Sequence, residues 1–186
     1  MNRQLKTELS DGTIIIRRYR AEDAAAVYEA VRESITEVSK WLPWCHADYA
    51  IDETRAFLRS QEEGWTEGKD YGFGIFDAGT NVYYGGVGLN HIVEEYRYAN
   101  LGYWVRTGSV GRGIASRATR LAARFGFEEL GLQRVEIVAA VENVGSQRVA
   151  EKAGARREGV LRKRIVLYGV THDAVLYSLV AEDLTL

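Results

Sequence analysis

The spacing of apolar residues along the chain alternates between the period of a strand and the period of a helix. Seven stretches have the β-branched and aromatic content of strands, and they span residues 13–20, 71–77, 82–93, 97–106, 133–141, 157–167 and 173–180. Four stretches have helical spacing or helix-end signals, and they span residues 22–34, 52–65, 113–130 and 146–153. No repeat or linker interrupts this order, so we predict a single α+β domain over residues 1–186.

Turn and cap residues divide these stretches. The loop 78–81, Ala-Gly-Thr-Asn, predicts an antiparallel hairpin between the strands on either side of it, and the segment 168–171 predicts a second hairpin near the C-terminus. Asp52 is placed to cap the second helix. Gly131 is placed to end the third helix, and Gly154 the fourth.

The segment Trp41-Leu42-Pro43-Trp44 contains the only proline of the chain and two of its four tryptophans. Proline interrupts a helix at this point. Two interpretations are open for the segment. Large aromatic side chains bury much surface, which favours a hydrophobic corner packed under the next helix, while the alternative is the wall of a pocket.

Composition excludes some classes of function. The chain has 46% hydrophobic and 27% charged residues and a formal net charge of -2, so it has no general affinity for nucleic acid or an acidic membrane surface. The single cysteine, Cys45, excludes an intrachain disulfide, and the three histidines lack metal-ligand spacing, so we expect no metal. There is no apolar run long enough to span a membrane and no sign of a secretion signal, so we expect a cytoplasmic protein.

The loop Val110-Gly111-Arg112-Gly113-Ile114-Ala115 lies between a predicted strand and a predicted helix. Backbone N–H groups at the start of a helix, together with the helix dipole, attract anions, and phosphate is the usual ligand. The two glycines allow close approach of a ligand and permit positive φ. The alternative is an ordinary strand-to-helix turn whose glycines serve geometry alone.

Two kinds of phosphate-bearing ligand fit this loop. A nicotinamide dinucleotide would use Gly111 and Gly113 as the start of its glycine fingerprint, with Glu142 on the ribose, but Ser116 replaces the third glycine and Glu142 lies too far along the chain. An acyl-CoA needs a pyrophosphate cradle and a gap beside a strand for its pantetheine arm. The sequence offers both features.

Several motifs in order resemble the GNAT superfamily of N-acetyltransferases, and most closely its RimJ/RimL branch, which acetylates protein N-terminal amines. The resemblance covers nearly the whole chain and is carried by residues 102–105, 111–115, 127–135, 142–146, 158–159 and 169–178. It implies a mixed, mostly antiparallel central sheet of about seven strands, flanked by helices, whose central strands splay apart. It also implies acetyl-CoA as co-substrate.

The resemblance assigns the co-substrate site residue by residue. The backbone of residues 110–115 would bind the CoA pyrophosphate, with Arg112 as the one side chain expected to meet a phosphate. Trp104 and Val105 would lie along the pantetheine arm, where a backbone N–H would also stabilise the thioester oxygen as it becomes negative. Asn143 would hydrogen-bond the same arm.

The resemblance also implies two catalytic residues. Many relatives have a tyrosine where this chain has Ala150, and its hydroxyl protonates the leaving thiolate; in the RimL-like branch a serine serves instead, and Ser146 matches it. The alternative for Ser146 is a helix cap. Glu158 matches the general base of that branch, acting through water, and its alternative is a solvated charge beside two arginines.

We therefore expect an enzyme that transfers the acetyl group of acetyl-CoA to a primary amine, most plausibly a protein or peptide N-terminal α-amine, by direct attack in a ternary complex. Small-molecule amines such as polyamines, amino acids or antibiotics are an alternative class of acceptor. A nicotinamide-dependent oxidoreductase and a non-catalytic acyl-CoA-binding regulator are further alternatives. We expect no nucleic-acid or membrane partner, and a homodimer is left open.

Overall fold

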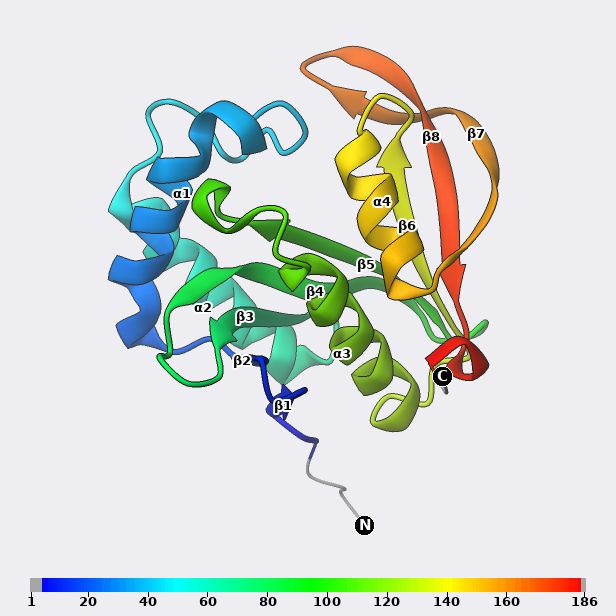
Figure 1. Ribbon diagram of the computed structural model, residues 1–186, viewed down its shortest axis with the longest axis horizontal. Coiled ribbons are helices and arrows are strands. Elements are labelled where there is room, and N and C mark those ends of the chain that lie inside the picture. The colour runs from blue at the N-terminus through cyan, green and yellow to red at the C-terminus, as the bar shows by residue number, and fades with distance from the viewer. Residues whose placement is uncertain (1–4, 185–186) are drawn as a thin grey trace.

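The computed structural model describes residues 5–184 (Figure 1). Its helices are α1 Ala24–Val38, α2 Ile51–Glu67, α3 Ile114–Glu128 and α4 Val144–Ala153. Its strands are β1 Glu8–Ser10, β2 Ile14–Arg18, β3 Tyr71–Asp77, β4 Tyr83–Val93, β5 Tyr98–Val105, β6 Arg134–Ala140, β7 Arg156–Leu167 and β8 Val170–Leu179. The 3-10 turns are η1 Ala21–Asp23, η2 Thr107–Ser109 and η3 Ala181–Leu184.

All the strands form one open sheet in the order β1-β2-β3-β4-β5-β6-β8-β7. Every neighbouring pair is antiparallel except β5 and β6. The predicted mixed, mostly antiparallel sheet of an α+β domain is therefore confirmed. The sheet has one strand more than expected because the short β1, which carries few β-formers, pairs with β2 at its edge.

The parallel pair at the centre of the sheet separates soon after it forms. β5 pairs with β6 only from Tyr98 to Asn100, opposite Arg134 to Glu136. Beyond Asn100, β5 continues on β4 as far as Val105, while β6 continues on β8. The edge of β5 that faces β6 is thus free of a strand partner from Leu101 onward, which confirms the predicted splay.

Helices cover both faces of the sheet (Figure 1). Phe73 contacts Phe125 of α3 on one face, with ring centroids 5.1 Å apart. Its neighbour Gly72 points the other way, since a Cβ built there would meet Gln61 of α2. Because successive residues of a strand point to opposite faces, α2 and α3 lie on opposite sides of the sheet. α1 packs beside α2, and α4 beside α3.

Seven of the eight helix boundaries differ from the predicted ones, by one to four residues, and two of these differences have a clear physical cause. α1 continues to Val38, because Ile35 and Val38 extend its apolar stripe onto the cluster around Tyr83. α2 begins at Ile51 and is capped by Glu53, whose Oε1 accepts a hydrogen bond from the backbone N–H of Ala50.

Asp52 does not cap α2 as predicted, because the helix begins at Ile51 with Ala50 as its N-cap, which places Asp52 inside the first turn. Its carboxylate pairs with Arg55 at 2.8 Å. The C-terminal hairpin is confirmed, with a two-residue turn at Tyr168-Gly169. Both residues of that turn have positive φ, as a type I′ turn requires.

Candidate active site

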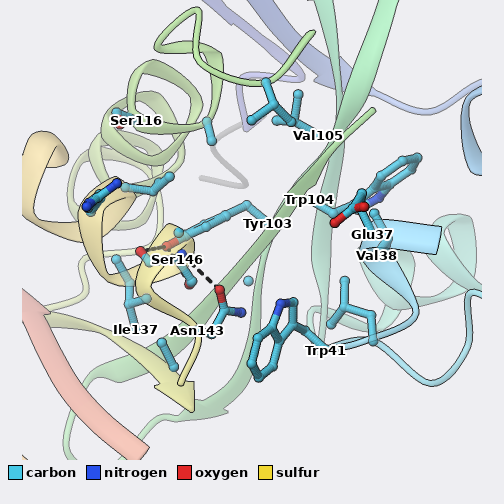
Figure 2. Close-up of a pocket in the computed structure, with 18 of the residues that line it drawn as sticks. Glu37, Val38, Trp41, Tyr103, Trp104, Val105, Ser116, Ile137, Asn143 and Ser146 are labelled. Carbon is cyan, nitrogen blue, oxygen red and sulfur yellow. Dashed lines mark hydrogen bonds between the residues drawn. The ribbon is translucent and has the colours of Figure 1, made fainter. Parts of the chain in front are cut away.

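The splay between β5 and β6 opens a cavity of about 540 Å³, which we call the slot cavity (Figure 2). Its walls are the free edge of β5 from Leu101 to Val105, the facing segment of β6 from Ile137 to Ala140, the loop before α3 and the first turns of α4. The structure brings these predicted co-substrate residues together as lining: Trp104, Val105, Val110, Gly111, Gly113, Ile114, Ala115, Asn143 and Ser146. Arg112 and Glu158 do not line it.

The loop before α3 brings two glycines, Gly111 and Gly113, to the wall of the slot cavity. Gly111 has φ of 84° and Gly113 has φ of 76°, a conformation that strains any residue with a Cβ. A Cβ built at either glycine meets no atom within 4 Å, so conformation rather than space requires glycine here. The first N–H groups of the 15-residue α3 have no partner within the helix and suit an anion.

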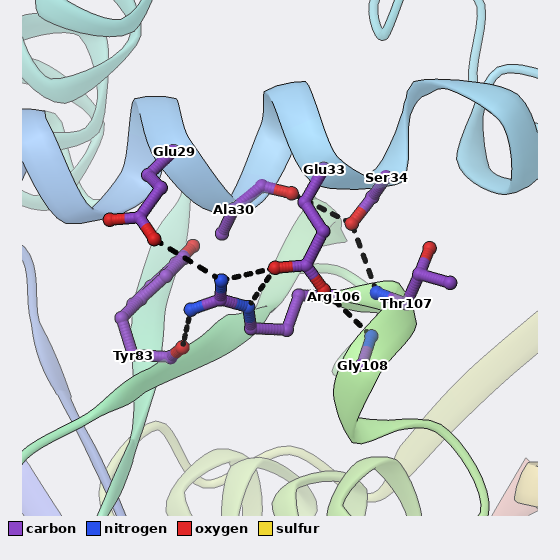
Figure 3. A network of polar contacts seen from close by, with 8 residues as sticks. All are labelled: Glu29, Ala30, Glu33, Ser34, Tyr83, Arg106, Thr107 and Gly108. Atoms are coloured by element: carbon purple, nitrogen blue, oxygen red, sulfur yellow. Dashed lines mark hydrogen bonds and ion pairs between the residues drawn. The ribbon is translucent and has the colours of Figure 1, made fainter.

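A polar network ties the beginning of this loop to α1 (Figure 3). Glu33 accepts hydrogen bonds from the Arg106 guanidinium, at 2.9 Å from Nε, and from the Gly108 N–H at 2.7 Å. Ser34 Oγ accepts from the Thr107 N–H at 3.0 Å. Arg106 and the Gly108 N–H lower the pKa of Glu33, so it stays ionised and the loop is fixed by a charge-assisted clamp.

The cations near the loop are arranged differently from the prediction. The Arg112 guanidinium lies over the Tyr84 ring, 5.0 Å from its centroid, and donates to the Tyr84 hydroxyl at 3.2 Å. The side chain expected to meet a phosphate is therefore turned onto β4. Arg148 and Lys152, one helical turn apart on α4, are the cations that line the slot cavity, and the loop sequence gave no sign of Lys152.

Ser146 lies at the meeting point of α4 and β5. The cap of α4 is Asn143, whose Oδ1 accepts from the Ser146 N–H at 3.0 Å, so the cap role considered for Ser146 belongs to Asn143. The Ser146 hydroxyl instead lies 3.0 Å from the hydroxyl of Tyr103, which also donates to the Ser146 carbonyl at 2.8 Å. Figure 2 shows the two side chains pointing toward one another in the slot cavity.

Tyr103 is a candidate residue that the sequence reasoning missed. Burial raises its pKa to about 12, so the phenol keeps its proton at neutral pH and can donate or relay one. The Gly-Tyr-Trp-Val motif drew attention to this strand, but only the fold brings the Tyr103 hydroxyl to Ser146.

Glu158 lies on β7 and does not line the slot cavity. Both of its carboxylate oxygens accept from Arg134, at 2.6 Å each, and one also accepts from Ser178 at 2.6 Å. Arg134 first and Ser178 second lower the pKa of Glu158 to about 2. A carboxylate held in this way accepts a proton poorly, so its surroundings favour a structural ion pair over the predicted general base.

A second cavity, of about 460 Å³, lies on the other face of β5. We call it the aromatic cavity, after its walls of Tyr19, Trp44, Tyr49, Phe57 and Trp104. Where the sheet borders this cavity, four of its residues are glycines and so have no side chains. They are Gly72, Gly86, Gly88 and Gly102. A Cβ built on Gly102 meets no atom within 4 Å, so this position opens directly into the space.

The two cavities share Gly102, Tyr103 and Trp104 of β5. The segment after α1 also belongs to both, because Trp41 lines the slot cavity, Trp44 the aromatic cavity and Leu42 each of them. Trp44 is 41% exposed and stacks edge-on against Trp104, with ring centroids 5.6 Å apart. Of the two interpretations of this segment, the pocket wall is therefore favoured over the hydrophobic corner.

Other features of the described part of the chain place limits on the chemistry. Among residues 5–184, no group of three or more His, Cys, Asp or Glu side chains is placed to hold a metal ion. No helix in the same range combines the length and the apolar character that crossing a membrane requires. Cys45 is fully buried and burial raises the pKa of its thiol, as a structural cysteine requires.

Comparison with known proteins decides the family. The model of the Acetyltransferase (GNAT) domain matches residues 13–156. The chain belongs to the GNAT acetyltransferase family. The family match confirms the resemblance that the motifs indicated. It covers most of the elements that enclose the two cavities, while Ile165 and Leu167 of β7, which also line the slot cavity, lie beyond it.

Individual relatives agree with the family. The Bacillus subtilis protein named "Probable N-acetyltransferase YjcK" is 33% identical over 73% of this chain and 75% of its own length. "Putative ribosomal N-acetyltransferase YdaF", from the same organism, is 30% identical over 91% of this chain and 92% of its own length. The crystal structure of the acetyltransferase MccE in complex with acetyl-CoA and AMP is 24% identical and shares the fold, with a TM-score of 0.84, covering 92% of this chain and 93% of that one.

The ribosomal acetyltransferase among these relatives supports the RimJ/RimL branch. As a GNAT family member the chain is an acyltransferase with acetyl-CoA as co-substrate. The alternative of a nicotinamide-dependent oxidoreductase is thereby set aside.

Proposed function

We propose that the enzyme acetylates a primary amine, the N-terminal α-amine of a protein or peptide, by direct attack on acetyl-CoA in a ternary complex. The observation that carries the proposal is the pair of cavities that meet at residues 102–104 of β5. One cavity has the features of a CoA site, and the other is an aromatic space open to a second molecule. No covalent intermediate on the enzyme is needed, because the thioester is already activated.

The slot cavity would hold acetyl-CoA along β5. The N–H groups at the start of α3 would bind the pyrophosphate, and the cations Arg148 and Lys152 would meet a further phosphate. The pantetheine arm would occupy the gap that β6 leaves beside β5, where it can take the place of a paired strand. A backbone N–H on this free edge, at Trp104 or Val105, would stabilise the thioester oxygen.

The acceptor amine would reach the thioester from the aromatic cavity, past Gly102. As the C–N bond forms and the C–S bond breaks, the thiolate of CoA takes a proton from the Ser146 and Tyr103 hydroxyl pair, which lies on the slot side. A free thiol has a pKa of about 8.5, so CoA is a fairly good leaving group and a positioned donor suffices.

An N-terminal amine is the acceptor that fits this site best. Its pKa of about 7.7 to 8.0, against about 10.4 for lysine, leaves a useful fraction neutral near pH 7. The relative named as a ribosomal N-acetyltransferase supports a protein acceptor. A small amine remains the second candidate, because the aromatic cavity is a bounded space of about 460 Å³.

A binding and transfer experiment tests the proposal. Calorimetry should detect acetyl-CoA binding and no comparable binding of NAD. The acetyl-transfer assay should then release CoA with peptides that have a free N-terminus, and more slowly or not at all with their N-terminally blocked forms. Release with polyamines or antibiotics alone would move the assignment to small amines. Binding of acetyl-CoA without release for any amine would indicate a regulator rather than an enzyme.

A further inference from the structure

The aromatic cavity contains one carboxylate–imidazole pair. His46, in the segment between α1 and α2, places its Nε2 2.9 Å from Glu53 Oε2, and both residues line the cavity. Glu53 is itself fixed, because its other oxygen accepts from the Ala50 N–H at the start of α2. Arg32 of α1 holds the same segment by donating to the Ala47 carbonyl at 2.6 Å.

This pair defines the tautomer of the imidazole. Because an ionised carboxylate can only accept, Nε2 carries the hydrogen that bonds Glu53, and Nδ1 keeps its lone pair. The ring packs edge-on against Tyr49, with centroids 6.0 Å apart. Tyr49 in turn contacts Trp44, which contacts Trp104 of β5. A continuous row of rings therefore leads from His46 to the strand that separates the cavities.

The other titratable groups of the cavity are unsuited to accept a proton near neutral pH. Burial raises the pKa of Tyr19 and of Tyr49, and it raises the pKa of Tyr103 to about 12, so all three phenols stay protonated. The Ala50 N–H, with a further contribution from His46, lowers the pKa of Glu53. The carboxylate is therefore a positioning group, and the imidazole is left as the proton acceptor of the cavity.

We propose that His46, positioned by Glu53, removes the proton from the ammonium group of the acceptor bound in the aromatic cavity. The inference rests on the proposed function, and it gives His46 the role that the sequence resemblance gave to Glu158. His46 is the group that meets the substrate, and Glu53 acts through it.

The protons and bonds balance as follows. The acceptor enters as R–NH₃⁺ and gives one proton to His46 Nδ1, which leaves a neutral amine. The amine nitrogen bonds to the thioester carbonyl carbon, the C–S bond breaks, and the thiolate gains a proton from the Ser146 and Tyr103 hydroxyl pair. The second amine proton restores that pair through water, and His46 releases its proton to solvent, so the products are the acetamide, CoA and one proton.

The variant His46→Gln tests the proposal, with His172→Gln as matched control. Glutamine keeps the size and a hydrogen bond to Glu53 but cannot take a proton. His172 is also paired with a carboxylate, that of Glu142 at 3.6 Å, yet it lines neither cavity. The probe acceptors are a hexapeptide with a free N-terminal serine and spermidine, and kcat/KM for the acceptor is measured against pH with saturating acetyl-CoA.

Removing a general base costs on the order of 100-fold or more. We expect His46→Gln to lower kcat/KM for the acceptor about 100-fold at pH 7, with the rate still rising at alkaline pH as the free amine deprotonates itself. Acetyl-CoA affinity by calorimetry should stay within about 3-fold, and His172→Gln should behave as wild type. Wild-type kcat/KM, or an unchanged pH profile, in His46→Gln would overturn the proposal, as would loss of acetyl-CoA binding.

A second variant, Glu53→Gln, tests the positioning role. Glutamine at this place can still accept from the Ala50 N–H and preserve the helix cap. Without the negative charge the imidazolium is less stable, so the inflection of the kcat/KM profile should move to lower pH and the plateau should fall about 10-fold. An unmoved inflection would contradict the pair. A wild type that binds acetyl-CoA but acetylates neither probe would contradict the proposed function, and this inference with it, whereas an active His46→Gln contradicts the inference alone.

Discussion

The two sides of β5 are built in different ways. On the slot side the groups placed to bind are largely backbone: a free strand edge, glycines at positive φ and the N–H groups at the start of α3. On the aromatic side they are side chains gathered from Tyr19 after β2, from α1 and the segment that follows it, and from α2 and β5. A backbone site suits a co-substrate that is the same in every reaction of the family, whereas a side-chain site can change with the acceptor.

The largest expected effect concerns the hydroxyl pair where the two sides meet. Ser146→Ala together with Tyr103→Phe removes both proton donors near the sulfur, so we expect kcat to fall about 100-fold or more while calorimetric affinity for acetyl-CoA stays within about 3-fold. Each single variant should fall less, because the remaining hydroxyl still donates. If the double variant turns over at the wild-type rate, the pair has no part in protonating the thiolate.

A smaller effect is expected when the backbone cradle is distorted. Gly113→Val forces a β-branched residue to φ of 76°, which costs about 1 to 3 kcal/mol, so we expect acetyl-CoA affinity to fall about 10-fold. Gly131→Val is the matched control, since Gly131 has φ of 68° and lies outside both cavities. Denaturant unfolding should show a similar loss of stability in both variants, while only Gly113→Val should lose affinity for acetyl-CoA. A similar loss of acetyl-CoA affinity in both variants would show that the loop is not part of the binding site.

The side-chain contribution to the slot side should be smaller again. Arg148→Ala with Lys152→Ala removes the two cations that line this cavity, and exposed charge pairs are worth about 0.2 to 1 kcal/mol each. We expect CoA affinity to fall roughly 5- to 10-fold and that of 3′-dephospho-CoA to change less. Equal losses for both ligands would show that these cations do not meet the 3′-phosphate. Arg124→Ala, on α3 and outside both cavities, serves as control.

Glu158 lies outside both cavities, so we expect its substitution to change stability rather than binding or turnover. Its folded-state pKa of about 2 lies below the ordinary 4.5, so the stability it adds is present above about pH 4.5 and is lost as pH falls toward 2. The difference in unfolding free energy between wild type and Glu158→Gln should therefore be constant near neutral pH and shrink in acid. The rate of acetyl transfer by Glu158→Gln at pH 7 should stay within about 3-fold of the wild-type rate. A loss of rate on the order of 100-fold, without a change in stability, would instead support Glu158 as the general base.

Features that depend on neighbouring residues are those that the sequence could predict. The two hairpins, the apolar face of α3 and the glycine loop between β5 and α3 were predicted from local patterns. The structure confirms that these elements form. Ser146 and Asn143 could be predicted as site residues because the family motif is contiguous there. The edge strand β1 was missed, since three residues carry no periodic signal.

The rest depends on contacts between residues far apart in the chain. Arg112 was expected at a phosphate because it lies in the loop, but its side chain turns onto Tyr84, 28 residues earlier. Tyr103 meets Ser146 across 43 residues, and Glu158 is claimed by Arg134 across 24. The pairing of His46 with Glu53 spans only seven residues, but only the fold makes both residues part of the wall of the aromatic cavity.

The most direct test of the two-sided site is the affinity of a bisubstrate analogue, in which the CoA sulfur is joined through an acetyl bridge to the α-amine of a serine-starting peptide. If β5 separates the co-substrate from the acceptor and Gly102 is the passage between them, the analogue should bind wild type at least about 100-fold more tightly than CoA. In Gly102→Val, whose side chain enters the aromatic cavity, that gain should vanish while CoA itself binds almost as before. An analogue that binds no better than CoA, or whose gain survives in Gly102→Val, would contradict the account.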